Sequence, residues 1–178
     1  MSKSEKFTRE EKKFWQRNYH IEKPDNIPAD WHSFHSADSD CDDEFFYFLS
    51  LRVHSLQDIY LKSSVITDQA IEYMLNFKNL HSLFLRKNRL LSNGSIKYFN
   101  QMKNLRRLDI TATGINLAGL RDYLDNPVLR KIFIDSDESE EEIEEKASIL
   151  KLMVPDCKIY LNCSHSTDVF GNPEKPIF

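Results

Sequence analysis

The eleven residues from Leu80 to Leu90 read LHSLFLRKNRL, and the spacing of their apolar side chains decides the fold class. Leu80, Leu83 and Leu85 give the order apolar-x-x-apolar-x-apolar. The alternation at its end has the period of two residues that is typical of a β-strand. Another apolar residue, Leu90, follows after a polar break. The stretch therefore predicts a short strand followed by a turn.

The same pattern occurs four times along the chain. It begins at Leu56, Leu80, Leu105 and Leu129, at spacings of 24, 25 and 24 residues. Between the copies, apolar residues such as Ile71 and Met74 recur at helical spacing, and Thr67 and Asp68 before them are favourable N-cap residues. Each unit thus predicts a strand, a turn and a helix, and a fixed period of this length indicates a repeat architecture.

Such units are expected to stack. One unit buries about seven apolar side chains, each contributing roughly 1.5–3 kcal/mol. Ordering its residues costs about 1.5 kcal/mol apiece, so an isolated unit is unstable and its neighbours must cover its flanks.

The two ends of the stack need caps. Ile143, Ala147, Leu150 and Met153 have the spacing of a last amphipathic helix, and residues 157–161 follow it as a closing edge strand. At the other end, the apolar run 45–49 is expected to cover the first repeat. Trp31 lies 25 residues before Leu56, which predicts an earlier, degenerate unit.

The pattern resembles the leucine-rich repeat family, whose consensus is LxxLxLxxNxL. The resemblance extends over about residues 56–161, and Asn88 matches the family's asparagine, where Ser64 and Thr113 stand in the neighbouring units. The run 66–71 is similar to the helix-containing repeats of ribonuclease-inhibitor and F-box adaptor proteins. The ending at residues 154–161 is similar to that of small repeat proteins related to mitochondrial ATP synthase coupling factor B.

The resemblance implies an α/β fold, a short leucine-rich-repeat solenoid with parallel strands on the concave face and helices on the convex face. We expect a charged helical extension at residues 1–30, containing Phe7, Phe14 and Trp15. The repeat domain with its caps is expected at 31–163 and a disordered tail at 164–178.

A candidate contact surface follows from the residue between the last two apolar positions of each unit, which should point into the concave groove. This residue is aromatic in four of five cases, and basic residues flank it. The predicted partner-binding residues are Tyr60, Phe84, Arg86, Arg107, Lys131, Phe133 and Tyr160. Exposed aromatic and arginine side chains are typical of protein interfaces. The alternative is that these rings simply pack against one another along the sheet.

The charge distribution favours an acidic partner. The chain has 24 basic and 28 acidic residues, but Asp38 to Glu44 holds five acids and Asp135 to Glu145 holds eight. The remainder therefore has 24 bases against 15 acids. The acidic runs are either solvated loops or phosphorylation sites at serines such as Ser139, or they screen the basic groove.

We expect a non-catalytic protein-interaction module, a scaffold or assembly subunit that binds a partner with an acidic segment. Two alternatives stay open. The first is binding of RNA or single-stranded nucleic acid through phosphate contacts and base stacking. The second is a substrate-recognition adaptor in a larger complex.

No catalytic or cofactor motif is present in the sequence. The four glycines fit neither phosphate-binding pattern, and GxSxG does not occur. His32 and His35 with Cys41 lack the second half of a zinc site. We therefore expect no enzymatic activity, no cofactor, no metal and no small-molecule substrate.

The expected location is the cytoplasm or the nucleus. The three cysteines are odd in number and form no CxxC, which favours a reducing compartment over a disulfide framework. The first residues lack the apolar core of a secretory signal, and Glu5, Glu10 and Glu11 argue against a mitochondrial presequence. No apolar run approaches the roughly 18 residues of a membrane span, so we expect no membrane contact.

Overall fold

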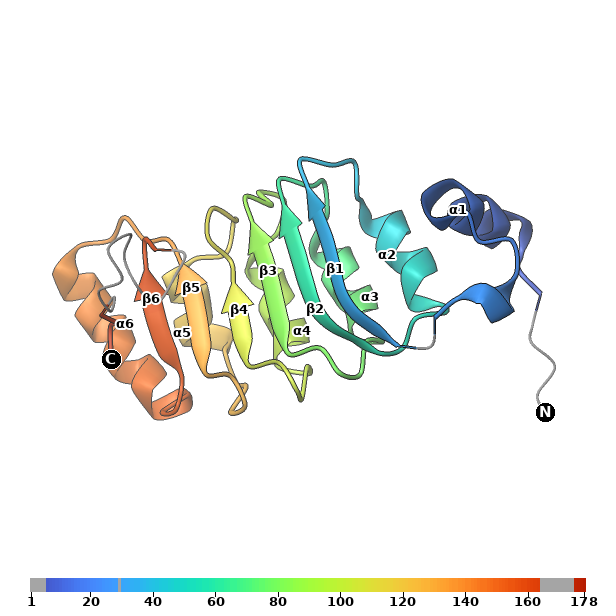
Figure 1. Ribbon diagram of the computed structural model, residues 1–178. Helices are drawn as coiled ribbons and strands as arrows, with labels where there is room; N and C mark the ends of the chain where they lie inside the picture. The colour runs from blue at the N-terminus through green and yellow to red at the C-terminus, as the bar shows by residue number, and fades with distance from the viewer. Residues whose placement is uncertain (1–5, 29, 164–174) are drawn as a thin grey trace.

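The computed structural model of the protein describes residues 6–28, 30–163 and 175–178. In this part of the chain six strands form one all-parallel sheet, and their order in the sheet is their order in the sequence (Figure 1). The strands are β1 (Trp31–Ala37), β2 (Leu56–Lys62), β3 (Ser82–Arg86), β4 (Arg107–Asp109), β5 (Lys131–Ile134) and β6 (Lys158–Leu161).

In the described ranges, six α-helices accompany the sheet, and all but the first lie in the connections between strands. They are α1 (Arg9–Tyr19), α2 (Asp43–Ser50), α3 (Asp68–Met74), α4 (Ile96–Phe99), α5 (Leu117–Tyr123) and α6 (Glu140–Met153), with short 3-10 turns η1 (Pro24–Asn26) and η2 (Asn93–Ser95). Among the described residues, no helix combines the length and apolar character that crossing a bilayer requires.

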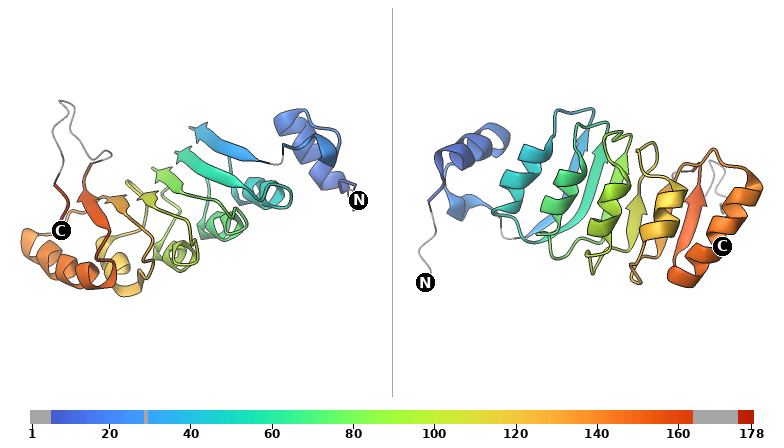
Figure 2. Two further views of the ribbon diagram at one scale, coloured as in Figure 1. Left: turned by 60° about the horizontal axis from the view of Figure 1, so that its bottom comes forward. Right: turned by 180° about the vertical axis from the view of Figure 1, so that it is seen from behind.

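Figure 2 shows helices α2 to α6 side by side on one face of the sheet. The sheet is curved, with the helices on the outer side of the arc and the strands on the inner side. Because every parallel connection returns through a helix on the same face, the opposite face carries no helix in the described part of the chain. That helix-free surface is called the strand face below.

The predicted units align in register. Ile59, Leu83, Leu108, Ile132 and Ile159 are Cα partners across successive strands, and all five are completely buried under the helices. The degenerate first unit is also present, because Trp31 pairs with Leu56. Burial of aliphatic side chains contributes roughly 25 cal/mol per Å² of apolar area, and this continuous layer is the main stabilising element of the sheet.

Polar side chains join neighbouring units about one repeat apart. Asn88 is fully buried, and its Oδ1 accepts hydrogen bonds from the backbone N–H and the hydroxyl of Ser64 at 2.8 and 2.6 Å. Thr113, at the equivalent place in the next unit, donates to the carbonyl of Ile110 at 2.7 Å within its own turn. The asparagine of the adjacent unit thus provides the hydrogen-bond acceptor for both the backbone N–H and the hydroxyl of Ser64.

The N-terminal helix packs on the repeats. Thr8 and Glu11 form a capping box that starts α1. The helix buries Trp15 and most of Phe14, whose ring lies 5.1 Å from that of Phe45 in α2. Nε of Arg52 donates to the Glu11 carboxylate at 2.6 Å. The helical extension expected from the sequence thus packs against α2 and lies beyond it at this end of the structure (Figure 1).

The C-terminal cap follows the sequence prediction. Ser139 and Glu142 form a second capping box that starts α6, and β6 closes the sheet. Most of the tail that we expected to be disordered, residues 164–174, lies outside the described residues. At its end, the backbone N–H of Ile177 donates to the carbonyl of Ile159 at 2.8 Å, so the last residues lie against the outer edge of β6.

Candidate functional site on the strand face

The predicted aromatic positions form a single column across the sheet. Strand register aligns them in the order His35, Tyr60, Phe84, Asp109, Phe133 and Tyr160. Side chains alternate between the two faces of a strand, so these residues, offset by one from the buried leucine column, point to the strand face. The geometric expectation of one aligned column is confirmed.

The rings in this column stack on one another. His35 and Tyr60 lie 4.2 Å apart between centroids and almost parallel, at 11°. Tyr60 and Phe84 repeat this geometry at 4.2 Å and 9°. Phe133 and Tyr160 stack at 5.0 Å and 13°. Ring spacing close to the distance between strands lets each ring cover the face of the next.

Arg107 continues the column where Asp109 interrupts it. Its guanidinium carbon lies 4.8 Å from the centroid of Phe84 and 5.1 Å from that of Phe133. A guanidinium between two rings is held by cation–π attraction and by stacking. The column is thus His35, Tyr60, Phe84, the Arg107 side chain, Phe133 and Tyr160, with a positive charge near its centre.

Asp109 is turned away from this stack and is neutralised by a neighbour. Its carboxylate has no exposed surface and accepts a hydrogen bond of 2.6 Å from Nε of Arg86. It also accepts bonds from the backbone N–H and the hydroxyl of Thr111, at 3.2 and 2.8 Å. Arg86 therefore has a carboxylate partner within the protein, and this partner is Asp109.

The expectation that the rings are exposed is wrong for three of them. Phe133 is completely buried, Tyr160 is 4% exposed and Phe84 is 9% exposed. They are covered in part because the faces of neighbouring rings cover one another, which is the alternative that the sequence left open. Tyr60, Arg86, Arg107 and Lys131 are half-buried and keep surface that a partner can reach.

A hollow of about 570 Å³ lies over the N-terminal half of the strand face. Its apolar wall is formed by Tyr60 and Phe84, and its basic groups are Lys62, Arg86 and Arg107. His35, Ser36 and Ala37 bound it on the β1 side. The structure therefore brings four predicted residues together here and leaves Lys131, Phe133 and Tyr160 outside.

Sequence reasoning missed His35 as a member of the column. The signal was present, because Trp31 lies 25 residues before Leu56 and the same offset from Tyr60 leads to His35. Lys62 is one of the basic residues that flank the aromatic positions, and it was not among the predicted partner-binding residues. Its register partners, Ala37 and Arg86, also line the hollow.

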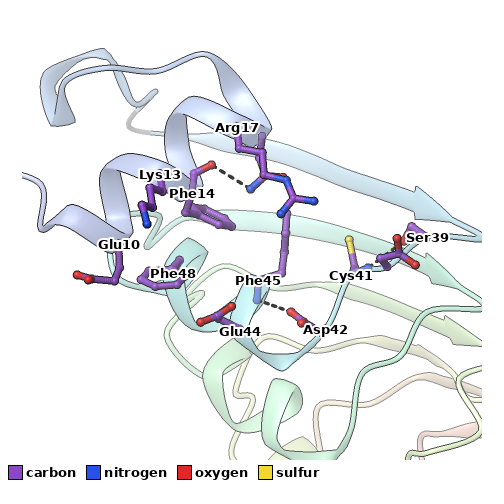
Figure 3. Close-up of a pocket in the computed structure, with 12 residues that line it drawn as sticks. Glu10, Lys13, Phe14, Arg17, Ser39, Cys41, Asp42, Glu44, Phe45 and Phe48 are labelled. Carbon is purple, nitrogen blue, oxygen red and sulfur yellow. Dashed lines mark hydrogen bonds between the residues drawn. The ribbon is translucent and has the colours of Figure 1, made fainter.

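A second hollow, of about 470 Å³, lies between α1 and α2 (Figure 3). Phe14, Phe45 and Phe48 form its floor, and Figure 3 shows Arg17 extending from α1 toward the loop that carries Cys41. The thiol of Cys41 donates to the hydroxyl of Ser36 at 3.5 Å. Basic groups of α1 thus face acidic groups of the loop before α2 across an aromatic floor.

The described residues contain no group of three or more His, Cys, Asp or Glu side chains arranged to hold a metal ion. His32 and His35 lie three positions apart in β1, so alternation along the strand directs their side chains to opposite faces. His35 contributes its ring to the stack instead.

No protein-family model matches the chain, and the search of curated proteins found none that matches it.

Proposed function

We propose that this protein is a leucine-rich-repeat solenoid whose role is non-catalytic binding of a protein partner through the strand face. The regular register of the leucine columns supports the repeat assignment, as does the buried Asn88 between units. A curved sheet with a helix-free inner face gives a broad surface for recognition, as is usual for repeat architectures. The protein would act as a scaffold or an assembly subunit.

The observation that carries this proposal is the state of the Arg107 guanidinium. It lies between two rings, its Nε is buried without a hydrogen-bond partner, and it forms no ion pair within the described residues. Lys62, on the other side of the hollow, has no carboxylate partner there either. Two unneutralised cations beside apolar ring surface favour an acidic side chain from a partner.

Ring geometry favours a protein over a nucleic acid. Base stacking needs free aromatic faces, but Tyr60 is covered on both sides, by His35 and Phe84. Phe84 is likewise covered, by Tyr60 and the Arg107 guanidinium. The column presents ring edges, whose hydrogens carry partial positive charge, and so adds to the attraction for carboxylates.

A reducing compartment, the cytoplasm or the nucleus, is the proposed location, because the three cysteines are odd in number and Cys41 and Cys157 are free thiols. A substrate-recognition adaptor would use the same surface to bind its partner. It would differ from a scaffold only in the other subunits of its complex.

The test is partner capture by the intact protein, compared quantitatively with a variant that carries Arg107→Gln and Lys62→Gln. The control variant is Lys97→Gln, which removes one positive charge from α4 on the helix side. We expect a partner with an acidic segment to be lost from the double variant and retained by the control. A photoreactive side chain placed at position 62 should cross-link to that acidic segment. If every captured protein is retained by the double variant, the strand face is not the binding surface.

The nucleic-acid alternative is decided by titrating single-stranded RNA at two salt concentrations. Micromolar binding with a steep salt dependence would contradict the preference for a protein partner. Absence of binding at low salt removes the alternative.

A further inference from the structure

Strand β1 has a free outer edge. The sheet order places β1 at one end, and its only strand partner among the described residues is β2. The backbone N–H of Asp38, directly after β1, donates to the carbonyl of Lys62 at 2.8 Å, so alternation along the ladder directs the N–H groups of Phe34 and Ser36 toward β2 as well. Those of Ser33, His35 and Ala37 point away from the sheet.

The sequence of this edge lacks the features that protect exposed strands. Edge strands are commonly short, or carry lysine, proline or a bulge that discourages pairing with another chain. β1 is seven residues long, as long as β2, and its sequence WHSFHSA contains no lysine, acid or proline. The opposite edge of the sheet differs, since Ile177 already pairs with Ile159 there.

The same edge borders the strand-face hollow. His35 is exposed, and one face of its ring lies against Tyr60, which leaves the outer face directed toward the free edge. Ala37, two residues further on and on the same face, is in register with Lys62. A strand added beside β1 would therefore continue both the ring column and the basic column.

We propose that the partner binds as an extended segment that pairs with the outer edge of β1. It places an aromatic side chain on the free face of His35 and an acidic side chain two residues away, beside Ala37 and within reach of Lys62. Backbone hydrogen bonds supply affinity in such strand addition, and alternate side chains supply specificity. This inference rests on the proposed function and specifies its ligand as an extended aromatic-x-acidic protein segment.

The probes are two nine-residue synthetic peptides in a threonine-rich background, one containing Phe-Thr-Asp and the other Asp-Thr-Phe, for parallel and antiparallel addition. Binding to the full chain is followed by calorimetry and by amide NMR. We expect one of the two to bind, with shifts and slowed hydrogen exchange at the amides of Ser33, His35 and Ala37. A peptide with Asn in place of Asp should bind more weakly.

The decisive variant is Ser33→Pro. Its lost N–H points away from β2, so the β1–β2 ladder is kept, and proline is tolerated at such edge positions. We expect the thermal midpoint to stay close to that of the parent and the peptide affinity to fall about tenfold. His35→Ala should also weaken binding through the lost ring contact. Should Ser33→Pro fail to fold, N-methylation of alternate peptide amides removes hydrogen bonds of the same added ladder from the ligand side.

Two results would overturn the inference. One is that neither peptide binds at millimolar concentration. The other is binding that is unaffected by both Ser33→Pro and N-methylation, which would locate the peptide elsewhere. Neither result touches the proposed function, which depends on the response of the natural partner to Arg107→Gln with Lys62→Gln.

Discussion

The carboxylate of Asp109 accepts a hydrogen bond of 2.6 Å from Nε of Arg86, and it does so at the point where the column of rings is interrupted. The carboxylate is completely buried, whereas Arg86 keeps part of its surface. The pair thus neutralises one arginine at the hollow, whereas the nearby Arg107 has no counter-charge among the described residues.

Removing either member of this pair should destabilise the protein. Arg86→Ala leaves a buried carboxylate without its cation, for which we expect a loss of about 3–5 kcal/mol in the free energy of unfolding. Asp109→Asn keeps one acceptor for Arg86 and should cost less. Urea denaturation measures both, and Asp122→Asn in the exposed pair with Arg121 is the control, with no measurable change expected. Equal losses for all three variants would contradict the special position of Asp109.

The stacked rings should contribute to stability according to their burial. Phe133 is fully buried between Arg107 and Tyr160, so Phe133→Ala should cost about 3–5 kcal/mol. Tyr60 is half-buried, and Tyr60→Ala should cost about 1–2 kcal/mol while weakening partner binding. Thermal and urea unfolding of the two variants give the comparison. A Phe133→Ala variant as stable as the parent would mean that this ring does not belong to the packed column.

Strand positions were predictable from sequence because the spacing of the leucines fixes them. Once Leu56, Leu80, Leu105 and Leu129 are aligned, every residue at a given offset falls into one column, and the observed register follows those offsets. The same arithmetic leads from Tyr60 back to His35. Period-two alternation then assigns each column to a face of the sheet.

The exposure of the rings was not predictable in this way. The distance of Phe84 and Phe133 along the sequence from the first leucine of their units places them on the strand face. It does not show whether neighbouring rings cover each other. Arg107 belongs by offset to a different column, and it enters the aromatic column only because the side chain of Asp109 is short and turned toward Arg86. That outcome depends on side-chain length and charge pairing, which a pattern of apolar positions does not contain.

Docking of α1 should depend on pH through Glu11. Burial raises the pKa of this carboxyl, but hydrogen bonds from Arg52 and Thr8 outweigh it, and the net pKa lies below its ordinary value of 4.5. A lowered pKa in the folded state means that the ionised carboxylate stabilises the fold above the unfolded value. That stability is lost as the pH falls, over about pH 5 to 3.

We therefore expect Glu11→Gln to lower stability at neutral pH and to flatten its decline in acid. Unfolding by urea at several pH values measures both effects. Glu10→Gln, in the same turn but exposed, should leave the profile unchanged. A parallel decline in the parent and in Glu11→Gln would show that another group governs the acid response.

The three thiols should react at very different rates. Burial raises the pKa of Cys157 to about 12, although the nearby Arg130 acts in the opposite direction. At pH 8 its thiolate fraction is then roughly a thousandfold smaller than that of a thiol with a pKa of 9. Cys41 and Cys163 are half-exposed and should be alkylated by iodoacetamide in the native protein, while Cys157 should react only after unfolding in urea. Mass spectrometry of peptides after timed alkylation gives the three rates. Rapid native labelling of Cys157 would mean that the segment before β6 opens locally, because the buried thiol can otherwise reach the reagent only by global unfolding.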